Sequence, residues 1–282
     1  MSKKQKTKVL IITQAMKPYL TSPESALAEI VRKLPQNLQE NGMEIRVLMP
    51  RFGTINERRH RLHEVVRLSG INIIIDEDDF PLIIKVASLP GARMQVYFLD
   101  NEDFFRRKNI FENKDGKFHK DNTERMIFFC KGVLETVRKF GWPPDVIHCH
   151  GWMSSLIPLY IRTAYGTDPI FTDAKIVYST YNDGFDAEMG KKFNKKALIR
   201  GVEADALTPY LGGSHNALSA GAIHYSDGII KGDEQLDESV TALLADTDKA
   251  VLEHQSLEED YLGTYRTFYK DLIAPEETEE EA

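Results

Sequence analysis

The stretch Pro144–Pro158, PDVIHCHGWMSSLIP, decides the fold. Its first half, Asp145–Cys149, is a short apolar run of the kind that forms a buried parallel strand, and a helix-like apolar run follows. In open α/β sheets, ligands bind just outside the carboxyl ends of the strands. His150, Gly151 and Trp152 lie at that end. They indicate either a site for a polar ligand with one flat apolar face, or a buried cap on a packed sheet.

The amino-terminal part of the chain predicts a β-α-β unit. Val9–Thr13 is a continuous β-branched and leucine run, typical of a buried strand. Ser22 is a good N-cap and Pro23 fits the first helical position, so we expect a helix to begin there. Asn41-Gly42 ends the helix, and Ile45–Met49 supplies the second strand.

Further apolar runs alternate with helical patterns along the rest of the chain, which is typical of an α/β fold. Three closely spaced runs predict a strand meander at the edge of the sheet: Ile71–Ile75, Leu82–Ala87 and Gln95–Leu99. Asp121–Gly141 predicts a long helix, Gly228–Lys231 a short strand and Ala250–Leu272 a terminal helix, whereas Asn182–Pro209 has no clear pattern. We therefore expect an α/β fold with a mostly parallel sheet, in one large or two small domains.

Composition limits the classes of partner and the compartment. The 282 residues carry a net charge of −7, which argues against a nucleic-acid partner. Five of the negative charges belong to the tail, residues 274–282, which we expect to be a disordered, solvating end. No stretch approaches the roughly 20 apolar residues of a membrane span. Cys130 and Cys149 both lie in apolar runs, which favours reduced core thiols and a cytoplasmic protein.

Metal and cofactor sites are not expected. His148, Cys149 and His150 are consecutive, whereas a closed zinc site needs four ligands at open loop spacing. No glycine-rich G-x-G-x-x-G sequence follows Val9–Thr13, so a dinucleotide site is not predicted either.

Five blocks, in order along the chain, resemble the amino-terminal domain of bacterial glycogen synthases and plant starch synthases. They are VLMPRFG (Val47–Gly53), FLDNEDFF (Phe98–Phe105), DNTERMIFFCKG (Asp121–Gly132), PDVIHCHGW (Pro144–Trp152) and ALSAGAIHYSDGII (Ala217–Ile230). The resemblance implies glucosyl transfer from ADP-glucose to an α-1,4-glucan. It also implies a glycosyltransferase-B fold of two facing Rossmann-like domains, with the glucan mainly on the amino-terminal domain and the nucleotide mainly on the other.

Three positions depart from the pattern that the resemblance implies. Pro23 stands where the family has the lysine of a Lys-Thr-Gly-Gly-Leu motif that neutralises the donor diphosphate, and only Lys17 lies nearby. Gly151 replaces an aspartate that bonds sugar hydroxyls. Tyr181 replaces a histidine that contacts the donor sugar, although the following Asn182 is kept. We therefore expect no intact catalytic residue at these family positions.

The resemblance covers one domain of two. We expect residues 8–243 to form this domain and residues 244–273 to supply a helix that packs back on it. The sequence Tyr261–Leu272 looks like the returning helix of two-domain glycosyltransferases. The donor-binding domain is expected to be missing.

Two functions follow as hypotheses. In the first, the chain is a degenerate, non-catalytic module that binds an α-glucan or a protein partner in glycogen metabolism. In the second, it is a half-enzyme completed in trans by a partner chain or by self-association into a homo-oligomer. The candidate ligand-binding residues are Lys17, His150, Trp152, Tyr181 and Asn182. Phe104 and Phe105 could also stack on sugars, but we expect them to be packing residues.

Overall fold

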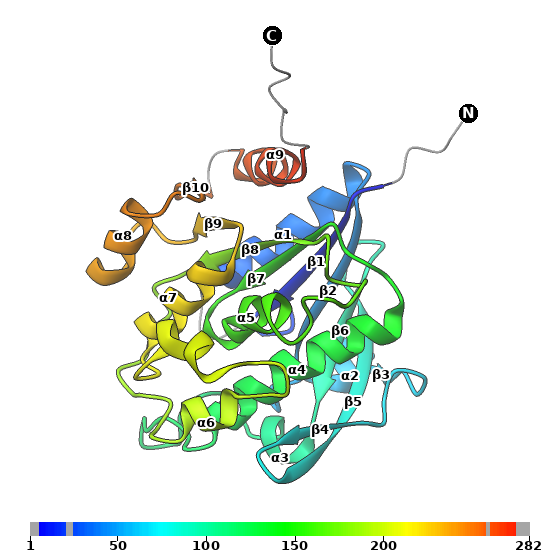
Figure 1. Cartoon of the computed structure of the whole chain (residues 1–282). Coiled ribbons are helices and arrows are strands. Elements are labelled where there is room, and N and C mark those ends of the chain that lie inside the picture. The colour runs from blue at the N-terminus through cyan, green and yellow to red at the C-terminus, as the bar shows by residue number, and fades with distance from the viewer. Residues whose placement is uncertain (1–5, 21–24, 258–259, 275–282) are drawn as a thin grey trace.

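The computed structural model describes residues 6–20, 25–257 and 260–274, which form a ten-stranded, mostly parallel sheet with helices on both faces (Figure 1). The strands follow the order β10-β9-β8-β7-β1-β2-β6-β5-β3, and β4 pairs with β5. Their bounds are β1 Lys8–Thr13, β2 Glu44–Pro50, β3 His63–Glu64, β4 Ile71–Ile75, β5 Asp78–Ser88, β6 Gln95–Asp100, β7 Val146–His150, β8 Lys175–Thr180, β9 Gly228–Lys231 and β10 Ala250–Leu252. The predicted α/β class is confirmed.

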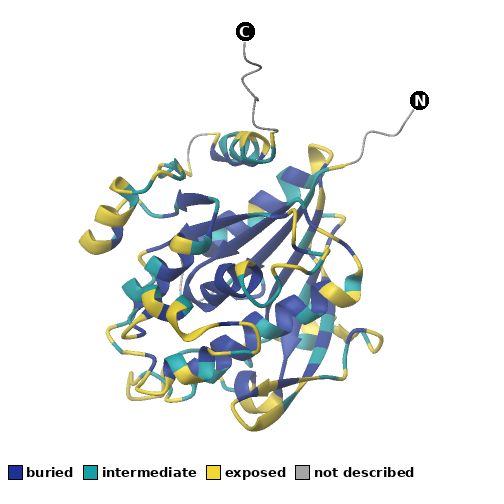
Figure 2. Cartoon of the chain, viewed as in Figure 1, coloured by how far each residue is buried: buried dark blue, intermediate teal, exposed yellow. Residues whose placement is uncertain are grey.

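The central strands are buried on both faces, which explains their unbroken apolar sequences. β1 lies between β2 and β7 and is parallel to both. All five residues of β7 are buried, including its two histidines. Figure 2 shows this buried centre as a continuous dark blue layer under the helices.

The helices form two layers. α4, α5 and α7 lie on the face turned toward the viewer in Figure 1, and α1 lies behind the sheet, where it contacts α9. Their bounds are α1 Ala26–Glu40, α2 Glu57–His60, α3 Glu102–Phe105, α4 Asn122–Phe140, α5 Leu156–Arg162, α6 Phe193–Ala197, α7 His215–Tyr225, α8 Glu238–Ala245 and α9 Tyr261–Ile273, with short 3-10 helices at Trp152–Ser154 (η1) and Ala204–Tyr210 (η2). Within the described residues, none of these helices combines the length and the apolar character needed to cross a membrane.

The predicted strand meander and helix ends are largely confirmed. β5 is antiparallel to both β4 and β6, and β6 joins the parallel part of the sheet beside β2. α4 ends at Gly141, whose left-handed backbone (φ 57°) suits glycine. The segment Asn182–Pro209, which had no clear pattern, contains α6 and most of η2.

The predicted start of the first helix is wrong. α1 begins at Ala26, and its N-cap is Ser25, whose hydroxyl accepts from the Ala28 N–H at 3.2 Å. Ser22 and Pro23 lie outside the described residues. Both serines are good caps by type, so residue preference could not choose between them.

The predicted terminal helix is too long. Ala250–Leu252 is not helical but forms β10, which pairs in parallel with β9. α9 begins only at Tyr261, after the N-cap Asp260, and buries Tyr261, Tyr265 and Tyr269. The acidic tail after Ala274 lies outside the described residues, and the division into domains at Leu243 stays a prediction.

Candidate functional site

A pocket of about 1030 Å³ opens at the carboxyl ends of the central strands. In the sheet, β1 has β2 on one side and β7 on the other, so the strand order reverses beside β1. Such a topological switch point is where open α/β sheets bind ligands. The lining comes from the segments after β1, β2, β7, β8 and β9, from the start of α1 and from the loop before α4. It includes Gln14, Ala15, Leu20, Ser25, Ala26, Leu27, Thr54, Lys108, Asn109, Ile110, Phe111, Glu112, Asn113, Phe118, Trp152, Tyr181, Asn182, Asp183, Gly184, Phe185, Asp233, Glu234 and Gln235.

The pocket floor contains a glutamine bridge beside Gly151. The Gln14 amide donates to Asp183 Oδ2 at 2.7 Å and accepts from the Met153 N–H at 3.0 Å. Gly151 has φ 75° and ψ 173°, a region that is essentially restricted to glycine. A Cβ there would lie 2.8 Å from Leu27 Cδ1 and 3.0 Å from Gln14 Oε1. The Leu27 and Gln14 side chains therefore occupy the space that any larger side chain at position 151 would need.

Aromatic rings form one wall of the pocket. Trp152 meets Phe111 and Phe185 edge-on, with ring centroids 4.9 and 5.1 Å apart, and Phe118 stacks on Phe185 at 4.4 Å. The three phenyl rings are half-buried, whereas Trp152 is only 1% exposed. Trp152 therefore acts mainly as the packed base on which the other rings rest. Of the two interpretations of Trp152, a ligand-binding ring or a packed cap on the sheet, packing accounts for most of its surface.

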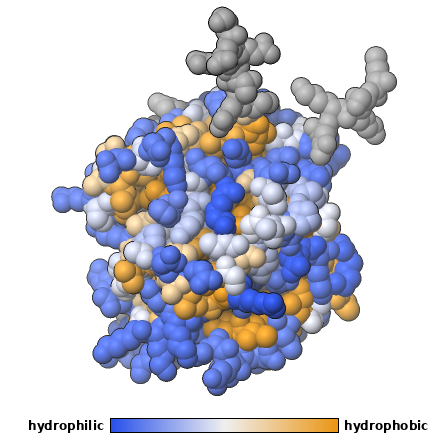
Figure 3. Space-filling view, viewed as in Figure 1, coloured by the Kyte–Doolittle hydropathy of each residue, from blue (hydrophilic) through white to orange (hydrophobic). Residues whose placement is uncertain are grey.

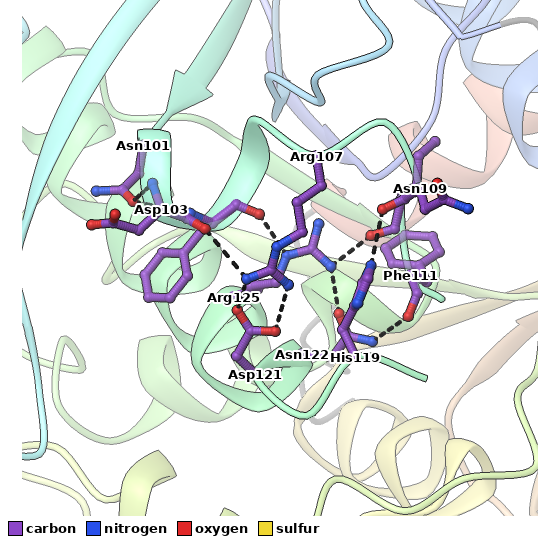
Figure 4. A network of polar contacts seen from close by, with 11 residues as sticks. Asn101, Asp103, Arg107, Asn109, Phe111, His119, Asp121, Asn122 and Arg125 are labelled. Atoms are coloured by element: carbon purple, nitrogen blue, oxygen red, sulfur yellow. Dashed lines mark hydrogen bonds and ion pairs between the residues drawn. The ribbon is translucent and has the colours of Figure 1, made fainter. Parts of the chain in front are cut away.

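A buried arginine fixes the loop that carries this wall (Figure 4). Arg125 donates to the carbonyl oxygens of Phe104 and Ile110, at 2.8 and 2.6 Å. Burial lowers the pKa of Arg125 to about 10. Asn122 donates to the Phe111 carbonyl at 2.8 Å. These bonds all end on backbone carbonyls, so they fix the path of the loop rather than one side chain.

An ion pair closes the other end of the same loop. The Arg107 guanidinium binds both carboxylate oxygens of Asp121, at 2.7 and 2.5 Å. Burial works to raise the pKa of Asp121, but hydrogen bonds and charge from Arg107 outweigh it, and the pKa lies below its usual range. Asp121 is the N-cap residue of α4, but its side chain makes no cap hydrogen bond and serves this ion pair instead.

Two neighbouring histidines, whose rings are tilted by 37° to each other, lie on the α9 side of the sheet. The rings of His148 and His150 are 3.7 Å apart. His148 contacts Tyr269 Oη at 2.6 Å and Ser179 Oγ at 2.7 Å, and His150 contacts Tyr181 Oη at 2.8 Å. Burial lowers the pKa of His150 to about 3 and that of His148 well below its usual value. Both imidazoles are therefore neutral near pH 7.

The structure brings together three of the five candidate ligand-binding residues. Trp152, Tyr181 and Asn182 line the pocket, although only Asn182 is exposed. His150 is fully buried and lies outside the described pocket lining, since its ring packs against His148 and contacts the Tyr181 hydroxyl. The Lys17 ammonium is also outside the lining and contacts Glu29 Oε1 on α1 at 2.5 Å. Ligand binding by any of them stays a prediction.

Several pocket residues were missed from the sequence. Gln14 follows β1 directly and Asp183 follows β8, so the rule that sites form after parallel strands could have found both. Phe111 and Phe118 lie in the loop before α4, and no local signal marks them as pocket residues. Phe104 and Phe105 are buried core residues, as expected. Within the part of the chain that the structure describes, no three His, Cys, Asp or Glu side chains gather to hold a metal ion.

Comparison with known proteins gives a consistent result. A family model described as the starch synthase catalytic domain matches residues 8–243. A glycogen synthase of Chlorobium phaeobacteroides is 45% identical over 176 residues, which are 62% of this chain and 36% of that protein. A glycogen synthase of Chlorobium limicola is 39% identical over 218 residues, or 77% of this chain and 44% of that protein. The chain thus spans less than half the length of these relatives.

A solved structure has the same fold. The catalytic domain of starch synthase IV from Arabidopsis thaliana, bound to ADP and acarbose, superposes with a TM-score of 0.71 at 18% identity. The match covers 89% of this chain and 52% of that one. At this identity the likeness concerns the arrangement of helices and strands and not the residues of the site.

Proposed function

Because the chain belongs to the family of starch synthase catalytic domains, we propose that it binds an α-glucan as a non-catalytic or regulatory module of glycogen metabolism. The observation that carries the proposal is the pocket lining. Amide side chains such as Asn109, Asn182 and Gln235 line the same pocket as half-buried aromatic rings, and sugars need this combination of hydrogen-bonding groups and apolar faces. We place this function in the cytoplasm, since both cysteines are free, buried thiols.

The same pocket argues against glucosyl transfer by these residues alone. Transfer needs preorganised groups that stabilise the leaving diphosphate, and losing one such group commonly costs ~10²–10³ in rate. Lys108 is the only lysine or arginine in the described lining, and it is exposed. Burial raises the pKa of Tyr181 well above its usual value, so this phenol stays neutral where the resemblance implies an imidazole.

Calorimetric titration with maltoheptaose and with ADP-glucose tests the proposal. We expect heat from maltoheptaose alone. Asn182→Ala removes an exposed amide from the pocket and should weaken that binding, whereas Asn72→Ala, on the exposed face of β4, should leave it unchanged. Absence of maltoheptaose binding would contradict the proposal.

The runner-up is a half-enzyme completed by a partner chain or by self-association. An exposed apolar surface favours it. Leu243 of α8 is 41% exposed and Leu257, between β10 and α9, is 37% exposed. Figure 3 shows apolar residues gathered over α8 and β10 at the left of the molecule. Such a surface is typical of one that pairs with another domain.

This second function has its own test. Radiolabelled glucose from ADP-glucose should enter a glucan only after a candidate partner chain is added, or only at concentrations at which the chain self-associates. Leu243→Ser should abolish that transfer without unfolding the chain, because the side chain is partly exposed. Absence of transfer with every candidate partner and at every concentration contradicts the half-enzyme.

A further inference from the structure

The described pocket lining is strongly acidic. Four carboxylates, Glu112, Asp183, Asp233 and Glu234, face one lysine, Lys108. A smaller chamber of about 310 Å³ adjoins the pocket, since both share the segment that follows β8. The chamber adds two more carboxylates, Asp186 and Asp237, and no lysine or arginine among its described lining residues. A concave surface lined by one sign of charge concentrates that field on whatever enters it.

Two of these carboxylates accept hydrogen bonds from uncharged amides. Asp183 accepts from the amide of Gln14 at 2.7 Å and lies 3.2 Å from His215 Nε2. Asp233 accepts from the backbone N–H of Asn182 at 2.7 Å. Amide donors satisfy a carboxylate without bringing a positive charge. The field of the carboxylates therefore extends into the pocket.

The aromatic wall adds to the same preference. Phe111, Phe118 and Phe185 are half-buried and line the pocket beside these carboxylates. The face of an aromatic ring is electrostatically negative and attracts a cation within about 6 Å of its centre. Carboxylates and ring faces in one cavity therefore favour a ligand that carries both an apolar face and a positive charge.

A buried hydroxyl without a protein partner points to a ligand in the chamber. Side chains alternate along β8: Ser179 faces the α9 side, where it binds His148, so Thr180 faces the α7 side. Thr180 is 1% exposed and lines the chamber beside Ser214 and His215, at the start of α7. Its Oγ1 has no hydrogen-bond partner within the described part of the chain. A buried polar group of this kind is normally satisfied, here by a polar group of a ligand.

We propose that this pocket and chamber bind a saccharide that carries a protonated amine, in preference to a neutral saccharide and against an anionic nucleotide sugar. The inference rests on the proposed saccharide-binding function and specifies the charge of the ligand. The amine lies among the carboxylates and ring faces, and a sugar hydroxyl bonds to Thr180.

The test compares probes that differ in one charge. Maltotriose is titrated beside three derivatives in which each ring in turn carries a 6-amino in place of its 6-hydroxyl group, and beside ADP-glucose. At least one amine should bind about tenfold more tightly than maltotriose at low salt, and the advantage should shrink as salt is raised. ADP-glucose should give no measurable binding.

Charge variants identify the pocket as the source of the preference. Glu112 and Glu234 are exposed, so the double change Glu112→Gln with Glu234→Gln should not affect folding. It should lower the ratio between the affinities for the amine and for maltotriose by roughly threefold or more. Glu40→Gln removes an exposed charge at the end of α1, near the amino end of β2 and outside the described pocket lining, and should change neither affinity.

Replacing the buried hydroxyl gives an independent readout. Thr180→Val keeps the shape of the side chain and removes a hydroxyl that is unpaired within the described structure, so the melting temperature should stay the same or rise. Binding of the amine should weaken by about tenfold or less, as expected for one hydrogen bond.

The outcomes separate the inference from the proposed function. If maltotriose binds and no amine binds more tightly, the charge preference is wrong and the saccharide-binding function stands. If no saccharide binds at all, the proposed function fails and the inference fails with it. If the preference survives in the Glu112→Gln and Glu234→Gln double variant, the pocket carboxylates are not its source and the inference is overturned.

Discussion

The side-chain amide of Gln14 donates a 2.7 Å hydrogen bond to the carboxylate of Asp183, 169 positions later in the sequence. The bond joins the segment after β1 to the segment after β8, across the intervening β7. With its other end, Gln14 accepts from the backbone N–H of Met153. One side chain therefore ties three strand ends together at the pocket floor.

Replacing this glutamine should destabilise the fold. Gln14→Ala leaves the Met153 N–H and an oxygen of Asp183 without their partner, and each loss typically costs about 1–3 kcal/mol. We expect a free energy of unfolding lower by about 2 kcal/mol in urea denaturation. Gln36→Ala, which removes a half-buried glutamine bonded to the exposed Glu40, should change it by less than about 0.5 kcal/mol. Equal effects of the two variants would contradict the bridging role.

Gly151→Ala should lower the free energy of unfolding by more than a glycine replacement at an open position. Backbone strain in this region of φ and ψ costs of the order of 1–3 kcal/mol, and the added Cβ also crowds Leu27 and Gln14 at about 3 Å. Gly190→Ala is the matched control, since Gly190 also has a positive φ (86°) but no heavy atom within 4 Å of an added Cβ. Urea denaturation should show a larger loss at Gly151.

Combining Gly151→Ala with Gln14→Ala tests whether the Gln14 side chain crowds the added methyl group. Removing the Gln14 amide opens space next to the new methyl group, so the double variant should lose less stability than the sum of the single variants. Additive losses would mean that Gly151 is required only by its backbone geometry.

The loop wall of the pocket should loosen when its arginine is removed. Arg125→Met leaves the Phe104 and Ile110 carbonyls without a donor, and we expect a loss of about 2 kcal/mol or more in stability. Amide hydrogen exchange should become faster between residues 106 and 121. Arg106→Met provides the control, because the Arg106 side chain is 75% exposed and its ion pair contributes little. Unchanged exchange in the Arg125 variant would contradict the anchoring role.

The buried histidines His148 and His150 should make the protein less stable as the pH falls. In the folded state the pKa of His150 is about 3, and that of an unfolded histidine is about 6.5. Below pH 6.5 the unfolded chain therefore binds more protons, so the stabilisation is complete above that pH and is lost progressively toward pH 3. For His150 alone, the loss between pH 7 and pH 5 is about 2 kcal/mol.

Urea denaturation at pH 7, 6 and 5 measures this slope. His150→Asn should flatten it, whatever its effect on stability at pH 7. His63→Asn is the control, because His63 is exposed on β3 and should leave the slope unchanged. A slope that does not change in the His150 variant would show that other groups produce the pH dependence.

Most strands of the sheet could be predicted because the pattern that marks each of them lies within the strand itself. A run such as Ile45–Met49 is apolar enough to be buried on both faces, and no distant residue is needed to recognise it. The prediction for β10 was wrong for the opposite reason. Three residues, Ala250–Leu252, become a strand only because β9 lies beside them, and no local pattern records that pairing.

The site was predicted only in part, for a similar reason. Trp152, Tyr181 and Asn182 follow strands directly, so the general rule for open sheets places them at the pocket. Whether such a side chain faces the pocket or the core depends on distant packing. Tyr181, for example, turns its hydroxyl to His150 and buries its ring. The Gln14 bridge is likewise a contact between distant segments, which a single sequence does not reveal.

The last helix should depend on one buried hydroxyl. Tyr269 of α9 is fully buried and its Oη lies 2.6 Å from His148 Nδ1. Tyr269→Phe keeps the ring but leaves that nitrogen without its partner inside the core, which should cost about 1–3 kcal/mol. Because the lost contact joins α9 to β7, amide exchange in α9 should rise more than in α4. Tyr97→Phe removes a hydroxyl bonded to the exposed Gln95 and should leave stability within about 0.5 kcal/mol of the unmodified protein. If Tyr269→Phe is as mild as Tyr97→Phe, the ring packing alone holds α9 and the buried hydrogen bond contributes nothing measurable.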